Sequence, residues 1–269
     1  MFEAVRFEVV DGAAWLTLDR PEALNAMTER MHKEIEHCCR SVREDDDIRS
    51  LVVTGAGDQA FCIGSDIQFL DDAYADGNLA VLRDYLERLN ALLLGLESLP
   101  VPTIAVVNGK ARASGFELIL ACDLVLVAEE ARLGDVHTPF GHLPGGGATQ
   151  RAARKIGMPR ALELIWTGRW LSGQEAVAFG LALDAVPRAE LHARTDALLA
   201  KLVDKPRAVL SSIKGTTLRG WDLPLQEAIA LEANAYFEYV ATSADPVAAF
   251  RANRARRRAQ ARDGAVTVT

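Results

Sequence analysis

The chain has few cysteines, few aromatic residues and no long apolar run. Its four cysteines form no CxxC pair, which argues against a disulfide framework and is typical of a reducing compartment. No window approaches about 18 uninterrupted apolar residues, so no membrane span is expected. The N-terminal residues lack the cationic and then apolar pattern of a secretion signal. Together these absences predict a cytoplasmic protein with no membrane partner.

Positive charge is also in the minority, with 30 basic against 37 acidic residues and a net charge of −7. This balance argues against a nucleic acid partner. The charge is unevenly spread, because residues 251–269 hold six arginines and one aspartate, a local +5 that leaves −12 on residues 1–250. A chain of 269 residues buries enough surface to fold without a disulfide or a metal.

Short β-rich segments alternate with helical patterns over the first part of the chain. Asp11-Gly12 predicts a hairpin between strands at 4–10 and 13–19, and Thr28 opens a helix that reaches about Arg43. Further buried strands are expected at 50–54, 103–108, 124–128 and 181–186, with helices at 79–99 and 114–122. This alternation favours an α/β fold with crossover connections.

Only helices are expected after about residue 190, at 189–203, 206–218, 222–242 and 245–262. The change predicts an α/β domain over 1–195 and a helical C-terminal domain over 196–269. The second domain has too few residues for a large core, so we expect it to pack on the first domain or on a neighbouring subunit.

Three segments have residues suited to chemistry. Residues 60–67 place Gly64 among small residues after a buried strand, where the backbone can approach a ligand or simply turn tightly. Residues 108–117 join a strand to a helix start, whose free N–H groups favour a negative oxygen. Glu117 follows in the first turn, either for catalysis or to stabilise its own helix. His137, in a later loop, suits acid–base work or a structural hydrogen bond.

Other classes of site find little support. His37-Cys38-Cys39 falls on a helix, where adjacent side chains point apart, and His137 lacks partners at metal-ligand spacing. We therefore expect no metal. Neither GxGxxG nor GxxxxGK[ST] occurs, so dinucleotide and Walker-type phosphate sites are unsupported. Ser114-Gly115 lacks the flanking glycines of a nucleophile elbow.

Four motifs taken together resemble the crotonase superfamily, the enoyl-CoA hydratase/isomerase fold. They are DRPEALNA at 19–26, AFCIGSDI at 60–67, NGKARASGFELILACD at 108–123 and FGHLPGGGATQR at 140–151. The resemblance implies a spiral of ββα units over roughly 1–195 and a helical C-terminal domain that builds homotrimers, often paired as hexamers. It also implies an acyl-CoA thioester as substrate, with coenzyme A part of that substrate and no separate cofactor.

The resemblance also assigns roles to residues. Backbone N–H groups of Ser65 and Ser114, with Gly115 adjoining, would form an oxyanion hole for the thioester oxygen, at about 3–4 kcal/mol for each donor. Serine stands where the family usually has alanine and glycine, but only backbone is needed. The substrate contacts implied are Ala23, Gly64, Asp66, Ile67, Gln68 and Arg254.

Two glutamates hold the water in the family's hydratases, and this chain keeps only one of them. The first falls on Glu117, whereas the second position is His137. We therefore hypothesise a mixed acid–base pair that adds water across a 2,3-enoyl-CoA. Glu117 would activate water while His137 manages the proton at Cα, or the reverse.

Three alternatives stay open. One is hydrolysis of a carbon–carbon bond in a β-diketone, since relatives with that activity carry histidine in the matching loop. The others are a double-bond isomerase with one acid–base residue, and a non-catalytic acyl-CoA-binding oligomer. The basic end has two interpretations as well. Arg251, Arg254 and Arg258 recur at helical spacing and would meet the nucleotide phosphates of CoA, or pair with acidic surface.

Overall fold

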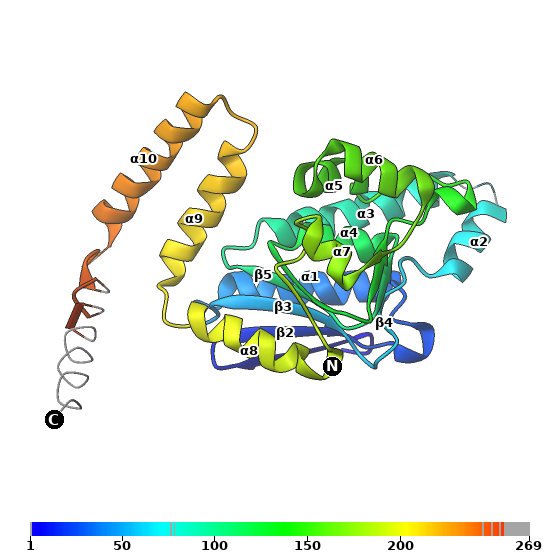
Figure 1. Cartoon of the computed structure of the whole chain (residues 1–269), viewed down its shortest axis with the longest axis horizontal. Helices are drawn as coiled ribbons and strands as arrows, with labels where there is room; N and C mark the ends of the chain where they lie inside the picture. The colour runs from blue at the N-terminus through cyan, green and yellow to red at the C-terminus, as the bar shows by residue number, and fades with distance from the viewer. Residues whose placement is uncertain are drawn as a thin grey trace. The chain divides into compact units, whose positions relative to one another are not determined.

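The computed structural model describes residues 2–75, 77, 79–243, 245–248, 250–252, 254 and 255. It divides into two compact units, Met1–Ser211 and Ser212–Thr269. All strands of the described chain belong to the first unit, where they form two sheets that helices surround (Figure 1).

The larger sheet has six strands in the order β1-β2-β3-β5-β7-β10. The predicted hairpin is confirmed, since β1 (Val5–Val10) and β2 (Ala13–Leu18) are antiparallel and join at Asp11-Gly12, both with positive φ. The other strands, which all run parallel to their neighbours, are β3 (Ser50–Gly55), β5 (Thr103–Val107), β7 (Leu124–Ala128) and β10 (Asp184–Val186). The expected strand at 181–186 is thus shorter by three residues at its start.

The smaller sheet consists of β4 (Ala60–Cys62), β6 (Lys110–Arg112), β8 (Arg132–Gly134) and β9 (Leu171–Ser172). The first three are parallel neighbours, and β9 is antiparallel to β8. Each of β4, β6 and β8 follows a strand of the larger sheet along the chain. A repeated pair of strands therefore places one strand in each sheet.

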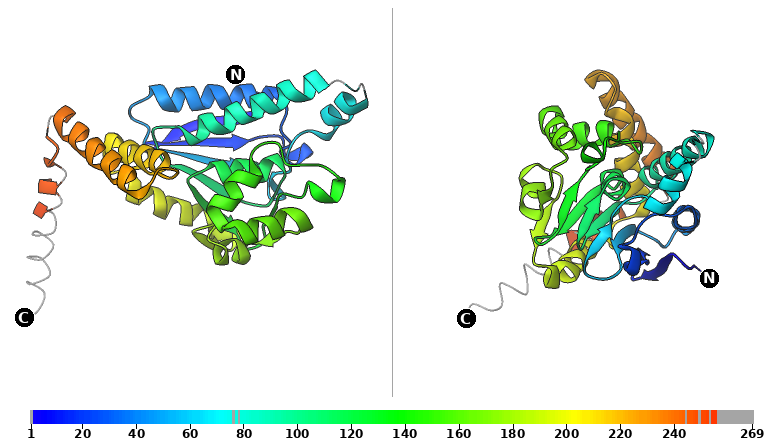
Figure 2. Two further views of the ribbon diagram at one scale, coloured as in Figure 1. Left: turned by 90° about the horizontal axis from the view of Figure 1, so that it is seen from above. Right: turned by 90° about the vertical axis from the view of Figure 1, so that its right-hand side faces the viewer.

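Apolar faces dictate how the helices pack. Thr28 caps α1 (Glu29–Glu44), since its hydroxyl oxygen accepts the N–H of Met31 at 3.2 Å. The apolar stripe of α1 is buried, and α1 lies side by side with α3 (Leu79–Glu97; Figure 2). All eight residues of α4 (Ser114–Ala121) are buried, so this helix lies inside the first unit.

The remaining helices are α2 (Ile67–Ala75), α5 (Ala148–Ile156), α6 (Met158–Thr167), α7 (Gly173–Ala178), α8 (Leu191–Leu202), α9 (Arg207–Gly220) and α10 (Leu225–Thr242). Among the described residues, no helix is both long and apolar enough to cross a membrane.

The division between the units differs from the sequence-based expectation. A boundary at 195/196 would cut α8, in which Leu191 and Thr195 are buried and Leu198 packs on the core of the first unit. The observed division follows Ser211 instead. Part of the expected last helix is present, with helical residues at 250–252, whereas 256–262 lie outside the described residues.

Buried His32 makes folding sensitive to acid. Its side chain lies on α1 at 1% exposure, and neither ring nitrogen has a hydrogen-bond partner among the described residues. Burial, followed by the charge of Arg88, lowers its pKa from 6.5 to about 4. His32 is therefore protonated below about pH 6.5 in the unfolded chain, but only below about pH 4 in the folded chain. This contribution to stability is intact above pH 6.5 and is lost as the pH falls.

We expect His32→Leu to flatten the acid side of the stability curve. Between pH 7 and pH 5 the free energy of unfolding of the wild type should fall by about 2 kcal/mol more than that of the variant. Urea unfolding at the two pH values measures the difference. His192→Gln, at an exposed histidine of α8, is the control. Equal losses in wild type and His32→Leu would contradict the assignment.

Candidate active site

The three segments singled out from the sequence leave the same edge of the smaller sheet. Strands β4, β6 and β8 are parallel neighbours, with Cys62 beside Ala111 and Arg112 beside Gly134. Because the carboxyl ends of parallel strands lie at one edge, the segments that follow them meet there. Ser65, Ser114 and His137 each come within three residues of such a strand end.

Within the described residues, the N–H groups of Ser65 and Ser114 have no hydrogen-bond partner, so both are available as donors. Met27 bonds to both neighbours of Ser65, because its N–H donates to the Gly64 carbonyl at 2.8 Å and its carbonyl accepts the Asp66 N–H at 2.9 Å. The N–H of Ser65 therefore faces away from Met27. Ser114 is the first residue of α4, where the N–H has no partner within the helix.

Two glycines allow these segments to approach each other. Gly64 has φ +98°, and a Cβ placed on it would lie 3.2 Å from the Ser114 nitrogen and 2.9 Å from the Ala113 Cβ. A Cβ on Gly115 would lie 2.1 Å from the carbonyl oxygen of Cys62, so only glycine fits between α4 and β4. The two available N–H groups are thereby held beside one another.

Glu117 is fixed in this space by backbone donors. Its side chain is 1% exposed, and Oε1 accepts the N–H groups of Gly146 at 2.7 Å and Ala148 at 3.2 Å. A Cβ on Gly146 would lie 2.3 Å from Oε2, so glycine at that position leaves room for the carboxylate. Burial is the largest influence on the Glu117 carboxyl and raises its pKa, although the charge of His137 opposes it.

His137 is oriented by a carboxylate that the sequence analysis did not single out. The ring Nδ1 lies 2.9 Å from Oδ1 of Asp135, a residue with no exposed side-chain surface. A carboxylate only accepts, so Nδ1 carries the proton and Nε2 is left for other contacts. Burial lowers the pKa of His137, but the bond and charge of Asp135, with the charge of Glu117, outweigh it and raise the pKa overall.

Glu117 and His137 are therefore brought together electrostatically as well as by topology. Each appears among the charges that influence the other's protonation. The N–H of Ala113, at the start of α4, also bonds to the carbonyl of Asp135 at 3.0 Å and ties the two segments. The arrangement joins a buried carboxylate, an oriented imidazole and two backbone donors, which is the equipment for acid–base chemistry on a group that develops negative charge on oxygen.

The other predicted substrate contacts lie in different settings. Asp66 pairs with Arg20 at 3.2 Å and accepts the N–H of Gln68 at 3.1 Å, so its carboxylate ties the segment at 19–26 to the start of α2. Ile67 and Gln68 are exposed, while Ala23 is partly buried. Arg254 belongs to the second unit and is exposed. Of the basic stripe, Arg251 pairs with Asp245 at 3.2 Å, and Arg258 lies outside the described residues.

Tyr85, which no sequence motif marks, lies on α3 at 2% exposure, and its hydroxyl donates to Ser65 Oγ at 2.5 Å. Its twenty-residue separation from Ser65 gave no local motif. The sequence does hold a signal for Asp135, because a carboxylate two residues before a histidine can reach its ring across a turn.

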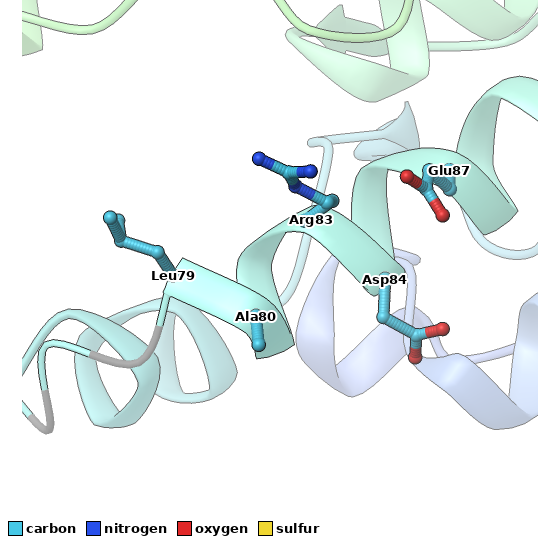
Figure 3. A pocket seen from close by; sticks show the side chains of 5 residues that line it. All are labelled: Leu79, Ala80, Arg83, Asp84 and Glu87. Atoms are coloured by element: carbon cyan, nitrogen blue, oxygen red, sulfur yellow. The ribbon is translucent and has the colours of Figure 1, made fainter.

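A hollow of about 340 Å³ lies along α3. Its lining residues are Leu79, Ala80, Arg83, Asp84 and Glu87 (Figure 3). None of them is among the catalytic, oxyanion or substrate-contact residues named from the sequence, although all lie in the segment 79–92 that the sequence suggests for the acyl pocket. Within the described ranges, no three His, Cys, Asp or Glu side chains gather in a way that would hold a metal ion.

Comparison with known proteins shows the family to which the chain belongs. Residues 8–255 match the family model for enoyl-CoA hydratase/isomerase. A Rhodobacter capsulatus protein named as a probable enoyl-CoA hydratase is 36% identical over 86% of this chain and 88% of its own length. The short-chain-enoyl-CoA hydratase of Clostridium acetobutylicum is 31% identical over 85% of this chain and 86% of its own.

A solved structure extends the likeness to three dimensions. The enoyl-CoA hydratase of Bacillus anthracis superposes with a TM-score of 0.89 at 30% identity, covering 94% of this chain and 97% of that one. The chain therefore belongs to the enoyl-CoA hydratase/isomerase family and has the crotonase fold, as the four motifs predicted.

Proposed function

We propose that this protein adds water to a 2,3-enoyl-CoA to give a 3-hydroxyacyl-CoA. The observation that carries the proposal is the convergence of the Ser65 and Ser114 N–H groups with Glu117 and His137 at one sheet edge. The N–H pair would bind the thioester oxygen and stabilise the enolate that forms when the nucleophile reaches Cβ. The named relatives support this class of reaction.

Glu117 would act as the base. Its Oε1 is committed to two backbone N–H groups, so Oε2 would take a proton from water as the oxygen attacks Cβ. Burial makes the ionised carboxylate a stronger base than an exposed one, because it disfavours the charged form.

His137 would act as the acid. With Nδ1 held by Asp135, the imidazolium would release the Nε2 proton to Cα of the enolate and become neutral. The proton on Glu117 would then return to His137 directly or through water, which restores the starting state. Each proton is moved by Glu117, His137 or water, so the proposal requires no cofactor beyond the CoA of the substrate.

Product analysis over a panel of enoyl-CoAs, from short to long and aromatic, tests the proposal. Hydration predicts a product heavier by one water with the thioester intact. An unchanged mass with a shifted double bond would indicate the isomerase, and cleavage of a β-diketone would indicate the carbon–carbon hydrolase. Tight acyl-CoA binding without turnover on any chain length would indicate the non-catalytic alternative.

We also propose that the protein works as a homotrimer or as a pair of trimers. Support comes from the second unit, where α10 buries none of its residues and large apolar side chains are exposed. They include Ile213, Leu218, Trp221, Leu225, Ile229 and Phe237. Such a surface is typical of subunit contact. Light scattering after size-exclusion chromatography measures the state, and a monomer at micromolar concentration would contradict it.

A further inference from the structure

Three hydroxyl groups form a row at the proposed oxyanion hole. The Tyr85 hydroxyl donates to Ser65 Oγ at 2.5 Å, and Ser65 Oγ lies 2.9 Å from Ser114 Oγ. These side chains come from α3, from the segment after β4 and from the first residue of α4. The two serines in the row are the residues whose backbone N–H groups are the proposed donors.

The direction of the row follows from the chemistry of its first member. Burial raises the pKa of Tyr85, so the phenol keeps its proton and acts as a donor. Ser65 Oγ accepts the hydrogen bond from Tyr85, and its own hydroxyl proton is then free to donate a hydrogen bond to Ser114 Oγ. The Ser114 proton then stands at the end of the row, where its oxygen has no further partner in the described part of the chain.

The phenol is held in place by rings rather than by other polar groups. Its ring centroid lies 4.9 Å from that of Phe69 and 5.1 Å from that of His32. Ser65 is the one hydrogen-bond partner of its hydroxyl in the described residues. Removing the hydroxyl alone would keep these ring contacts, so the effect of the hydrogen bond can be measured separately from the packing of the ring.

We infer that the Ser114 hydroxyl, polarised by Tyr85 through Ser65, is a third donor to the thioester oxygen beside the two backbone N–H groups. Tyr85 is then a positioning residue, and it acts on the substrate only through the serines. A chain of hydroxyls strengthens its last donor because each bond polarises the next. The inference rests on the proposed thioester site and adds one side-chain donor to it.

The kinetic test uses Tyr85→Phe, Ser65→Ala, Ser114→Ala and the double variant Tyr85→Phe/Ser114→Ala. We expect each single change to lower kcat about tenfold with KM within a few-fold, because the donor acts mainly when charge develops on oxygen. The double variant should be no slower than Ser114→Ala, since both changes disable one donor. Tyr236→Phe, at an exposed tyrosine of α10, is the matched control.

A second readout does not depend on water addition. A 3-oxoacyl-CoA ionises to an enolate that absorbs in the near ultraviolet, and a site that stabilises enolate oxygen should raise its bound enolate fraction at a fixed pH. We expect Tyr85→Phe and Ser114→Ala to lower that fraction, while Tyr236→Phe leaves it unchanged. If no hydration occurs but this difference persists, the inference holds and the proposed function fails. Turnover within twofold and unchanged enolate absorbance in both variants would overturn the inference.

Discussion

Glu117→Gln should lower kcat/KM for the preferred enoyl-CoA by about 10³-fold, within the range observed for removal of a general base. The amide has the size of the carboxylate, and its oxygen can still accept the N–H groups of Gly146 and Ala148. Folding and acyl-CoA binding should therefore survive, with Kd within a few-fold. Steady-state kinetics and calorimetric binding of a saturated acyl-CoA measure the two effects.

Glu36→Gln, at an exposed glutamate of α1, is the matched control and should keep full activity. Turnover of Glu117→Gln within a few-fold of wild type would show that the water is activated by another group. Loss of acyl-CoA binding together with activity would instead mark Glu117 as a structural residue, because its carboxylate ties α4 to the loop before α5.

His137→Ala should lower kcat/KM by about 10²-fold and remove the alkaline limb of the pH profile. In the wild type the rate should rise with pH as Glu117 ionises, and fall as His137 loses its proton. Both pKa values are raised in the fold, Glu117 by burial and His137 by Asp135. The acid limb should therefore lie above the ordinary pKa of a carboxyl group, and the alkaline limb above the ordinary pKa of an imidazole.

Asp135→Asn separates the position of the ring from its charge. The variant keeps a hydrogen-bonding group beside Nδ1 but removes the charge that raises the pKa of His137, so the alkaline limb should move to lower pH. Profiles of kcat/KM from pH 5 to about 9 measure the shift against thermal unfolding as the control for folding. An alkaline limb that is the same in wild type, Asp135→Asn and His137→Ala would exclude His137 as the acid.

The sequence was informative where a local pattern decides the structure. Asp11-Gly12 predicts its hairpin because few residues other than glycine, asparagine and aspartate tolerate the backbone of such a turn. Thr28 and the apolar stripe after it predict α1 for the same kind of local reason. The buried strands at 50–54, 103–108 and 124–128 were also found, since each is a short apolar run between turn residues.

What the sequence left out depends on contacts between distant residues. Strands β4, β6 and β8 have three residues each, which are too few to show an alternating pattern of apolar and polar residues. The pairing of these strands is what brings the site residues together. Tyr85 lies twenty residues after Ser65, too far along the chain for a local pattern to link the two. The observed boundary between the units differs from the predicted one for a related reason. The packing of Leu198 and its neighbours on the core of the first unit cannot be inferred from helical periodicity.

The edge formed by β4, β6 and β8 has a consequence for how this enzyme can change. Each strand anchors its own functional segment, so a segment can acquire a new residue while the other two keep their places. The two proposed backbone oxyanion donors belong to the main chain, so they survive side-chain replacements that spare Gly64 and Gly115, whereas the proposed hydroxyl donor requires serine at position 114. The residue at position 137 can thus be replaced while the three paired strands keep their positions. A new reaction could evolve there by point mutation, with thioester recognition inherited unchanged.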